Sequence, residues 1–143
     1  MDGTIVEYRV FPENFVTTET KEVFLNAEPL EVVLKNLEKI NEIENLDVYI
    51  LSLARSFIIV EEKKQWLKKY APFIREENYI LLNKENGDYN AENREFIKSI
   101  KMMEKLNEYD YVILLDDDHK ILKRTLNEVG KNGEVFHVSS ATM

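Results

Sequence analysis

Tyr111-Val112-Ile113-Leu114-Leu115-Asp116-Asp117-Asp118 is the stretch of sequence that decides the fold. Its apolar and aromatic residues run directly into three carboxylates. A continuous apolar run rich in branched side chains is typical of a strand that is buried on both faces of a parallel sheet. Ligands of open α/β sheets bind beyond the carboxyl ends of such strands. Because adjacent acids repel one another, the stretch predicts a site for a hard cation such as Mg²⁺.

Helices and strands are expected to alternate on both sides of this strand. Apolar residues at helical spacing predict helices, and short apolar runs predict strands. The expected helices span Pro29 to about Asn41, Glu61 to Tyr70, Ala91 to about Asn107 and His119 to about Val129, and the expected strands span Leu46–Leu53, Tyr79–Leu82, Tyr111–Leu115 and Glu134–Val138. This alternation predicts an α/β fold with a parallel sheet and right-handed crossovers.

Length and composition bound the class of protein. With 143 residues, of which 44% are hydrophobic and 32% charged, residues 1–143 are expected to form one globular domain, with about residues 7–27 as a small flap. The formal net charge of −8 argues against a nucleic-acid polymer or an anionic membrane as the partner. The sequence has no cysteine, no secretory signal and no long apolar span, so a cytoplasmic location is expected.

Polar side chains follow or end several of the expected strands. Ser52, Lys84 and the Asp116–Asp118 acids stand at strand ends, and the turn Asp2-Gly3-Thr4 would fit the same edge if a strand preceded it. A hydroxyl can hydrogen-bond a phosphate oxygen, and a lysine can neutralise phosphate charge. Carboxylates can hold Mg²⁺, which stabilises the transition state of phosphoryl transfer. The edge of the sheet therefore predicts chemistry on a phosphate group.

These residues resemble the four motifs of the haloacid-dehalogenase-like hydrolases, in the order of that family. Met1-Asp2-Gly3-Thr4 resembles the last four positions of the first motif, Asp-x-Asp-Gly-Thr, and Ile50-Leu51-Ser52 resembles the second. Lys84 best matches the lysine of the third motif, and Leu114-Leu115-Asp116-Asp117 resembles the fourth. The similarity extends from Met1 to about Val138.

The similarity is closest to the bacterial branch that resembles 5'(3')-deoxyribonucleotidases. Val23–Pro29 resembles the segment that leads into the first helix of that branch, and Glu61–Tyr70 resembles its Lys-x-x-Trp-Leu helix. The resemblance implies a three-layer Rossmann-like fold with a parallel sheet and a small flap or cap. The first strand of that fold, which lies in the middle of the sheet, would be missing from this chain.

The activity implied by the resemblance is Mg²⁺-dependent hydrolysis of a phosphate monoester, including nucleotidase activity, through an aspartyl-phosphate. By the same resemblance, Asp2, Asp116 and Asp117 would hold Mg²⁺, Thr4, Ser52 and Lys84 would hold the phosphate, and Asp2 would also act as general acid and base. The expected partner is a small phosphorylated molecule, and a homodimer stays open as an alternative.

One departure from the family pattern bears on activity. The nucleophile of the family is the first aspartate of the first motif, which would stand immediately before Met1. A misassigned start codon, a shortened sequence or a true loss would each explain its absence, and we favour the first two. A true loss would leave a non-catalytic protein that binds a phosphorylated ligand. A third hypothesis is an acidic interaction module that pairs through an exposed sheet edge.

Some residues have competing interpretations. Arg94 and Lys98 are rivals of Lys84 for the electrostatic role of the third motif. Asp118 is expected to cap the helix that follows it, as acids at helix N-termini commonly do. The run Glu61–Lys64 is expected to form a solvated helix face.

Overall fold

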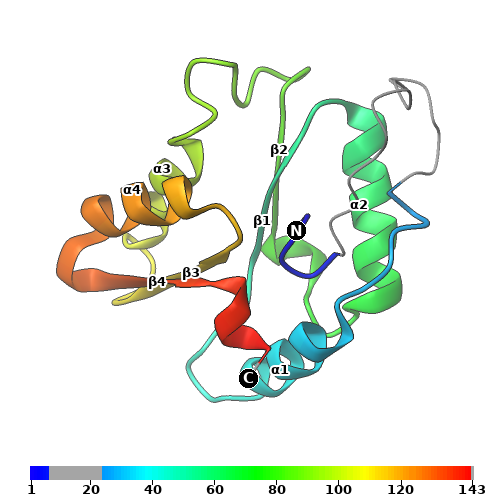
Figure 1. The fold of residues 1–143 in the computed structure, drawn as a ribbon, viewed down its shortest axis with the longest axis horizontal. Helices are drawn as coiled ribbons and strands as arrows, with labels where there is room; N and C mark the ends of the chain where they lie inside the picture. The colour runs from blue at the N-terminus through cyan, green and yellow to red at the C-terminus, as the bar shows by residue number, and fades with distance from the viewer. Residues whose placement is uncertain (7–23, 143) are drawn as a thin grey trace.

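The structure is a computed structural model that describes residues 1–6 and 24–142, and these residues form a mixed α/β protein (Figure 1). Its helices are α1 (Glu31–Asn41), α2 (Phe57–Tyr70), α3 (Ile97–Lys105) and α4 (His119–Val129), and its strands are β1 (Ile50–Ala54), β2 (Tyr79–Asn83), β3 (Val112–Asp116) and β4 (Gly133–His137). The predicted alternation of strands and helices is confirmed. Most of the predicted flap, residues 7–23, lies outside the described residues.

The strands pair in parallel, as predicted, but they form two small sheets. β1 pairs with β2, with Ser52 opposite Leu81, and β3 pairs with β4, with Asp116 opposite His137. Within residues 1–6 and 24–142, no strand joins β1 to β3. The described strands therefore confirm the parallel pairing without forming the single continuous sheet that was expected.

Two helix starts show how local chemistry sets the ends of these elements. α2 begins at Phe57, earlier than predicted, because the Ser56 hydroxyl accepts a hydrogen bond from the Ile59 N–H at 3.3 Å. The Phe57 side chain is 58% exposed, so the apolar periodicity of the buried face does not reveal this first turn. The predicted cap of α4 is confirmed, because the Asp118 carboxylate accepts the Lys120 N–H at 2.8 Å.

The two sheets share one interior. Leu51 of β1 packs against the apolar cluster of β3 and α4, and Leu115 of β3 packs against the cluster that contains Trp66. Away from the carboxyl ends of the strands, the hydroxyls of Tyr49 and Tyr109 share a hydrogen bond of 2.8 Å. These contacts hold the sheets together without strand pairing.

No helix that the structure describes is long and apolar enough to cross a membrane.

The N-terminal turn, Met1–Val6, is built into this interior. The Met1 carbonyl accepts hydrogen bonds from the backbone N–H groups of Thr4, Ile5 and Val6 at 3.0–3.2 Å. Gly3 has a φ of 70°, and a Cβ built at this position would lie 2.2 Å from an Asp117 carboxylate oxygen. The predicted Asp-Gly turn therefore lies directly against the end of β3, and a glycine is required there for both reasons.

We expect replacement of Trp66 by alanine to destabilise the fold by about 3–5 kcal/mol, since it would leave a cavity in the core. The Trp66 side chain is fully buried, and its indole N–H donates to the Ala27 carbonyl at 2.9 Å. Urea unfolding would measure the loss. Phe57→Ala on the same helix is the matched control, and its exposed side chain should cost no more than about 0.5 kcal/mol. Equal losses for the two variants would contradict the packing described here.

Candidate functional site

Lys63 is the centre of the candidate site. Its side chain lies on α2 and is almost fully buried, with a residue exposure of 1%. The ammonium donates hydrogen bonds to the Ser52 hydroxyl at 2.8 Å and to the Leu53 carbonyl at 2.7 Å, and it lies 3.5 Å from an Asp2 carboxylate oxygen. Burial lowers the pKa of Lys63, and the charge of Asp2 opposes this shift. The N-terminal turn, β1 and α2 therefore meet at one ammonium group.

The expectation that Glu61–Lys64 forms a solvated helix face is wrong for its two central residues. Both Glu62 and Lys63 are buried. Lys63 follows the buried spacing of α2, because it lies three and four positions before the inward residues Trp66 and Leu67. This helical spacing is the signal that could have identified Lys63 from the sequence.

Ser52 lies inside β1, because the strand continues to Ala54. The expectation that the strand ends at Ser52 is therefore wrong. The Ser52 side chain is buried and accepts the hydrogen bond from Lys63. Ser52 is thus fixed in orientation by both the strand and the lysine.

A second buried lysine meets the end of β3. Lys98, in the first turn of α3, donates to an Asp116 carboxylate oxygen at 2.6 Å. The other oxygen of Asp116 accepts the Asp118 N–H at 3.0 Å. Burial by itself would raise the pKa of Asp116, but Lys98 and the Asp118 N–H together outweigh it and hold the pKa below its usual value. Asp116 is therefore an ionised, doubly hydrogen-bonded carboxylate.

The amino group of Met1 is buried and lies close enough to Lys63 and Lys98 for both charges to act on it. Burial lowers its pKa to about 5, and the charges of Lys98 and Lys63 lower it further, while Asp2 and Asp116 oppose them. These mutual effects place the two lysines, the two carboxylates and the amino group within electrostatic reach of one another. Residues from the N-terminal turn, β1, α2, α3 and β3 thus form one charged cluster, which we call the lysine cluster and which is buried except for the Asp2 side chain.

The structure gathers some of the residues that the sequence singled out and separates others. Asp2, Ser52 and Asp116 belong to the lysine cluster. Asp117 is exposed as a residue, but its carboxylate lies against Gly3, and the partial desolvation of that carboxylate together with the charge of Asp116 raises its pKa. Thr4 is buried in the N-terminal turn, next in sequence to Gly3.

The three candidates for the third-motif lysine differ in their distance from the acids at the end of β3. Lys84 and Arg94 are both exposed, and none of their hydrogen bonds or ion pairs among the described residues reaches the lysine cluster. Lys98, which the sequence offered as a rival, forms the ion pair with Asp116. The geometry therefore favours Lys98 over Lys84 for a role beside the acids.

The acids at the end of β3 suit Mg²⁺ by their chemistry. Carboxylate oxygens are the ligands that Mg²⁺ prefers, and it commonly takes one or two of them together with water and phosphate oxygens. Asp116 and Asp117 supply such oxygens side by side. In residues 1–6 and 24–142, no group of three or more His, Cys, Asp or Glu side chains is close enough to hold a metal. Asp2 therefore does not complete a three-carboxylate group with them in this arrangement.

No protein-family model, curated protein or solved structure matches the chain. The chemistry of the site is therefore inferred from its geometry. Two buried ammonium groups and a buried hydroxyl favour a compact anion, and the adjacent acids can hold a hard cation.

Removal of the Lys98 ammonium should leave Asp116 as an uncompensated buried charge. We expect Lys98→Met to lower the free energy of unfolding by about 3–5 kcal/mol, as for other buried ion pairs that lose one partner. Chemical denaturation at neutral pH would measure this. Lys101→Met is the matched control, because Lys101 pairs with Glu104 on the same helix near the surface, and it should cost no more than about 0.5 kcal/mol. An equally small effect of Lys98→Met would show that the pair contributes little.

The same ion pair predicts a dependence of stability on pH. The pKa of Asp116 is lowered in the folded state, so its stabilisation is complete above the unfolded pKa, near 3.9, and is lost as the pH falls through the folded value. The wild type should therefore be more stable than Asp116→Asn near pH 7, and the difference should shrink below about pH 4. Urea unfolding of both proteins across this range would test it. A difference that is independent of pH would contradict the assignment.

Proposed function

We propose that this chain supplies the phosphate-holding and metal-holding residues of a Mg²⁺-dependent phosphate monoester hydrolase of the haloacid-dehalogenase type. The observation that carries the proposal is the lysine cluster, in which Ser52, Lys63, Lys98 and Asp116 gather beside the N-terminal turn. The proposed fold is the three-layer Rossmann-like fold of that family with a small flap. The proposed substrate is a small phosphorylated molecule, such as a nucleoside monophosphate, in the cytoplasm.

Each residue has a stated role in this proposal. Ser52 and Lys63 hold the phosphate oxygens, because a hydroxyl and an ammonium 2.8 Å apart can donate to the same anion. Lys98 neutralises charge at the reacting group, which is the role that the sequence assigned to Lys84. Thr4 assists in holding the phosphate from the N-terminal turn.

The nucleophile in this proposal is an aspartate immediately before Met1. The Met1 amino group is buried, and the charges of Lys63 and Lys98 act on it. An aspartate joined at this point would therefore place its carboxylate near both ammonium groups. Two ammonium groups would keep that carboxylate ionised and ready to attack phosphorus. The Asp2 side chain is 52% exposed and lies 3.5 Å from Lys63, so it can exchange protons with a leaving group or water as general acid and base.

Asp116 and Asp117 would hold the Mg²⁺ through their carboxylates, and the backbone carbonyl of Asp2 would be a further oxygen donor, which leaves the Asp2 carboxylate for its role as general acid and base. The bound cation supplies Lewis-acid stabilisation of the negative charge on the phosphate. Because Asp116 already pairs with Lys98, metal binding must share or displace that contact. Lys98 would then remain beside the phosphate as a second source of positive charge.

A non-catalytic protein that binds a phosphorylated ligand is the alternative. One observation favours it: both Asp116 oxygens already accept hydrogen bonds, from Lys98 and from the Asp118 N–H. In that case the acids balance the lysine charges and the phosphate binds without turnover.

The test is phosphate release by a form of the chain that carries the upstream strand and aspartate before Met1. With Mg²⁺ and a broad panel of phosphate monoesters that includes nucleoside monophosphates, we expect turnover. Replacing the upstream aspartate or Lys63 (Lys63→Met) should reduce kcat by at least about 100-fold, since each removes a group that acts on the reacting phosphate. No release from any ester would overturn the hydrolase.

Two further variants separate the candidates for the third lysine. Lys98→Met should reduce turnover strongly, whereas Lys84→Met should leave it near the wild-type value. The reverse result would restore Lys84 to that role. Lys101→Met controls for loss of a surface charge on α3. Calorimetric titration with a phosphate monoester tests the alternative, because a binding protein should bind the ester and release no phosphate.

A further inference from the structure

The two histidines of the chain form a stacked pair beside the end of β3. The ring centres of His119 and His137 lie 4.5 Å apart, and the rings are parallel to within 4°. His119 is the first residue of α4, and His137 is the last residue of β4, where it stands opposite Asp116 in the strand pairing. The fold thus brings two segments of the chain together in this histidine pair.

The histidine pair is held in place from the His137 side. The Nδ1 atom of His137 accepts the Ser139 N–H at 3.3 Å and lies 2.9 Å from the Ser139 hydroxyl. His119 is exposed, and within residues 1–6 and 24–142 its ring contacts no aromatic ring other than that of His137. Because His137 covers one face of the His119 ring, the exposed part of this side chain lies on its other face and its edges.

The histidine pair adjoins the lysine cluster through the acids at the end of β3. Neighbouring strands of a sheet lie about 4.8 Å apart, so His137 stands one strand spacing from Asp116. Asp116 in turn pairs with Lys98. Asp117 lies against Gly3 of the N-terminal turn, which Figure 1 shows beside the carboxyl ends of β3 and β4. A small ligand whose phosphate lies at the lysine cluster can therefore extend toward the histidine pair.

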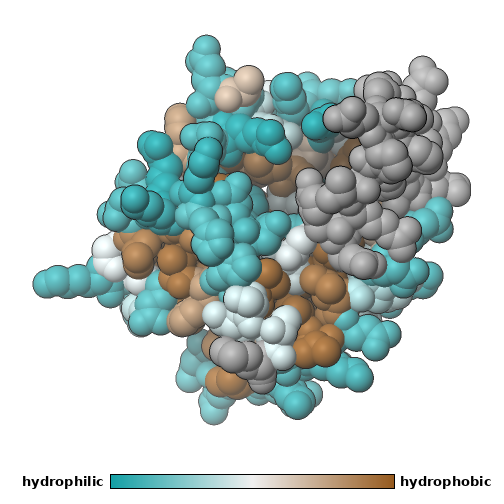
Figure 2. All heavy atoms as spheres, viewed as in Figure 1, coloured by the Kyte–Doolittle hydropathy of each residue, from teal (hydrophilic) through white to brown (hydrophobic). Residues whose placement is uncertain are grey.

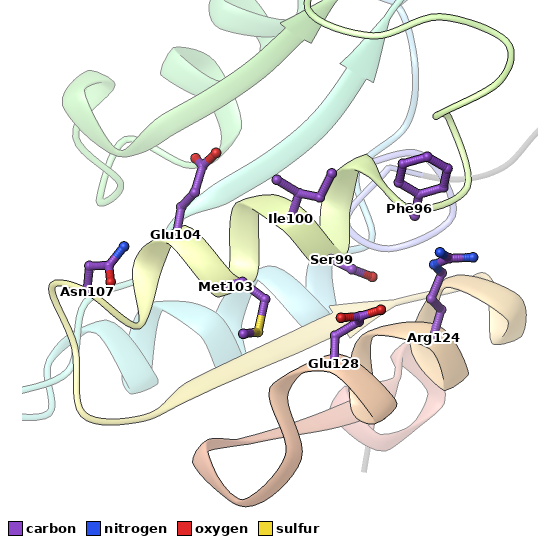
Figure 3. A pocket seen from close by; sticks show the side chains of 8 residues that line it. All are labelled: Phe96, Ser99, Ile100, Met103, Glu104, Asn107, Arg124 and Glu128. Carbon is purple, nitrogen blue, oxygen red and sulfur yellow. The ribbon is translucent and has the colours of Figure 1, made fainter.

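Other exposed surfaces suit such a ligand less well. A hollow of about 340 Å³ between α3 and α4 is lined by apolar side chains that include Phe96 and Ile100 (Figure 3). The one cation in its lining, Arg124, lies 4.7 Å from the centre of the Phe96 ring, and the carboxylates of Glu104 and Glu128 would repel a phosphate. On the face that Figure 2 shows, hydrophilic side chains separate the apolar patches of the described residues, which does not favour a broad apolar interface.

We propose that the histidine pair is a platform on which an aromatic base of the substrate stacks, with the His119 ring in contact with the base. This inference rests on the proposed function, because it takes the phosphate of the same molecule to lie at the lysine cluster. Stacking requires a flat aromatic ring and no particular pattern of hydrogen bonds. The platform therefore favours nucleoside monophosphates over phosphorylated sugars and accepts different bases, and His119 determines specificity without taking part in the chemical step.

The test compares the binding of adenosine 5'-monophosphate with that of ribose 5-phosphate, which has the phosphate and the sugar but no base. In calorimetric titrations with Mg²⁺ present, the wild type should bind the nucleotide about tenfold more tightly or better, as stacking on one aromatic ring provides. His119→Ala should remove most of this preference and leave the affinity for ribose 5-phosphate unchanged. His119→Phe keeps a flat ring and should retain the preference.

Phe57→Ala is the matched control for loss of an exposed aromatic side chain. Phe57 is 58% exposed and also follows a strand of the sheets, but that strand is β1 and not β3 or β4. Its removal should leave the preference for the nucleotide at the wild-type value. Loss of the preference in Phe57→Ala, with none in His119→Ala, would place the base at the start of α2 and overturn the platform. Circular dichroism confirms that each variant is folded.

The results separate the platform from the proposed hydrolase. Equal affinity of the wild type for the two esters, or an unchanged preference in His119→Ala, would overturn the platform and leave the phosphate site intact. A wild type that binds neither ester would overturn both. A preference that depends on His119, without phosphate release by the form that carries the upstream aspartate, would overturn the hydrolase and support the platform.

Discussion

The buried ammonium of Lys63 is the constraint on which the arrangement of this chain depends. An isolated charge in a protein interior costs far more than any single contact returns, so it must be surrounded by acceptors. Those acceptors come from β1 through Ser52 and Leu53, and from the N-terminal turn through Asp2. The packing of α2 on β1 therefore depends on the position of the N-terminal turn, which supplies Asp2 as an acceptor for Lys63.

The Lys98–Asp116 ion pair has the same role in the sheet that β3 and β4 form. It joins the first turn of α3 to the end of β3, and its charges reach the Met1 amino group. Because no described strand links β1 to β3, polar contacts at the N-terminal turn and apolar contacts through Leu51 and Leu115 provide the continuity between the sheets. The candidate site and the joint between the sheets are consequently built from the same residues.

Much of the fold could be predicted from the sequence because the apolar patterns of its elements are strong. The strand before Asp116 and the helix that begins at His119 occur nearly where the pattern puts them. Two short sheets could not be predicted, since strand pairing depends on contacts between distant segments rather than on local pattern. The start of α2 was missed because its cap, Ser56, precedes residues whose apolar side chains face solvent.

The candidate site was predicted in part, and the part that was missed has a common physical cause. Asp2, Ser52 and Asp116 were found because each stands beside a strong turn or strand signal. Lys63 was interpreted as solvated because charged residues usually are, yet its position on the buried face of α2 outweighs its charge once acceptors surround it. Lys84 is a candidate from the sequence because it follows a strand, but the position of a residue in the sequence does not show which groups its long side chain reaches.

The close approach of Gly3 to Asp117 sets a limit on which sequences can keep this site. Gly87 and Gly130 also have positive φ, which strains any other residue, but a Cβ at either would meet nothing within 4 Å. At position 3 even a methyl group would collide with the carboxylate. A side chain at position 3 would therefore require the exposed Asp117 carboxylate to move, in addition to the backbone strain of the positive φ.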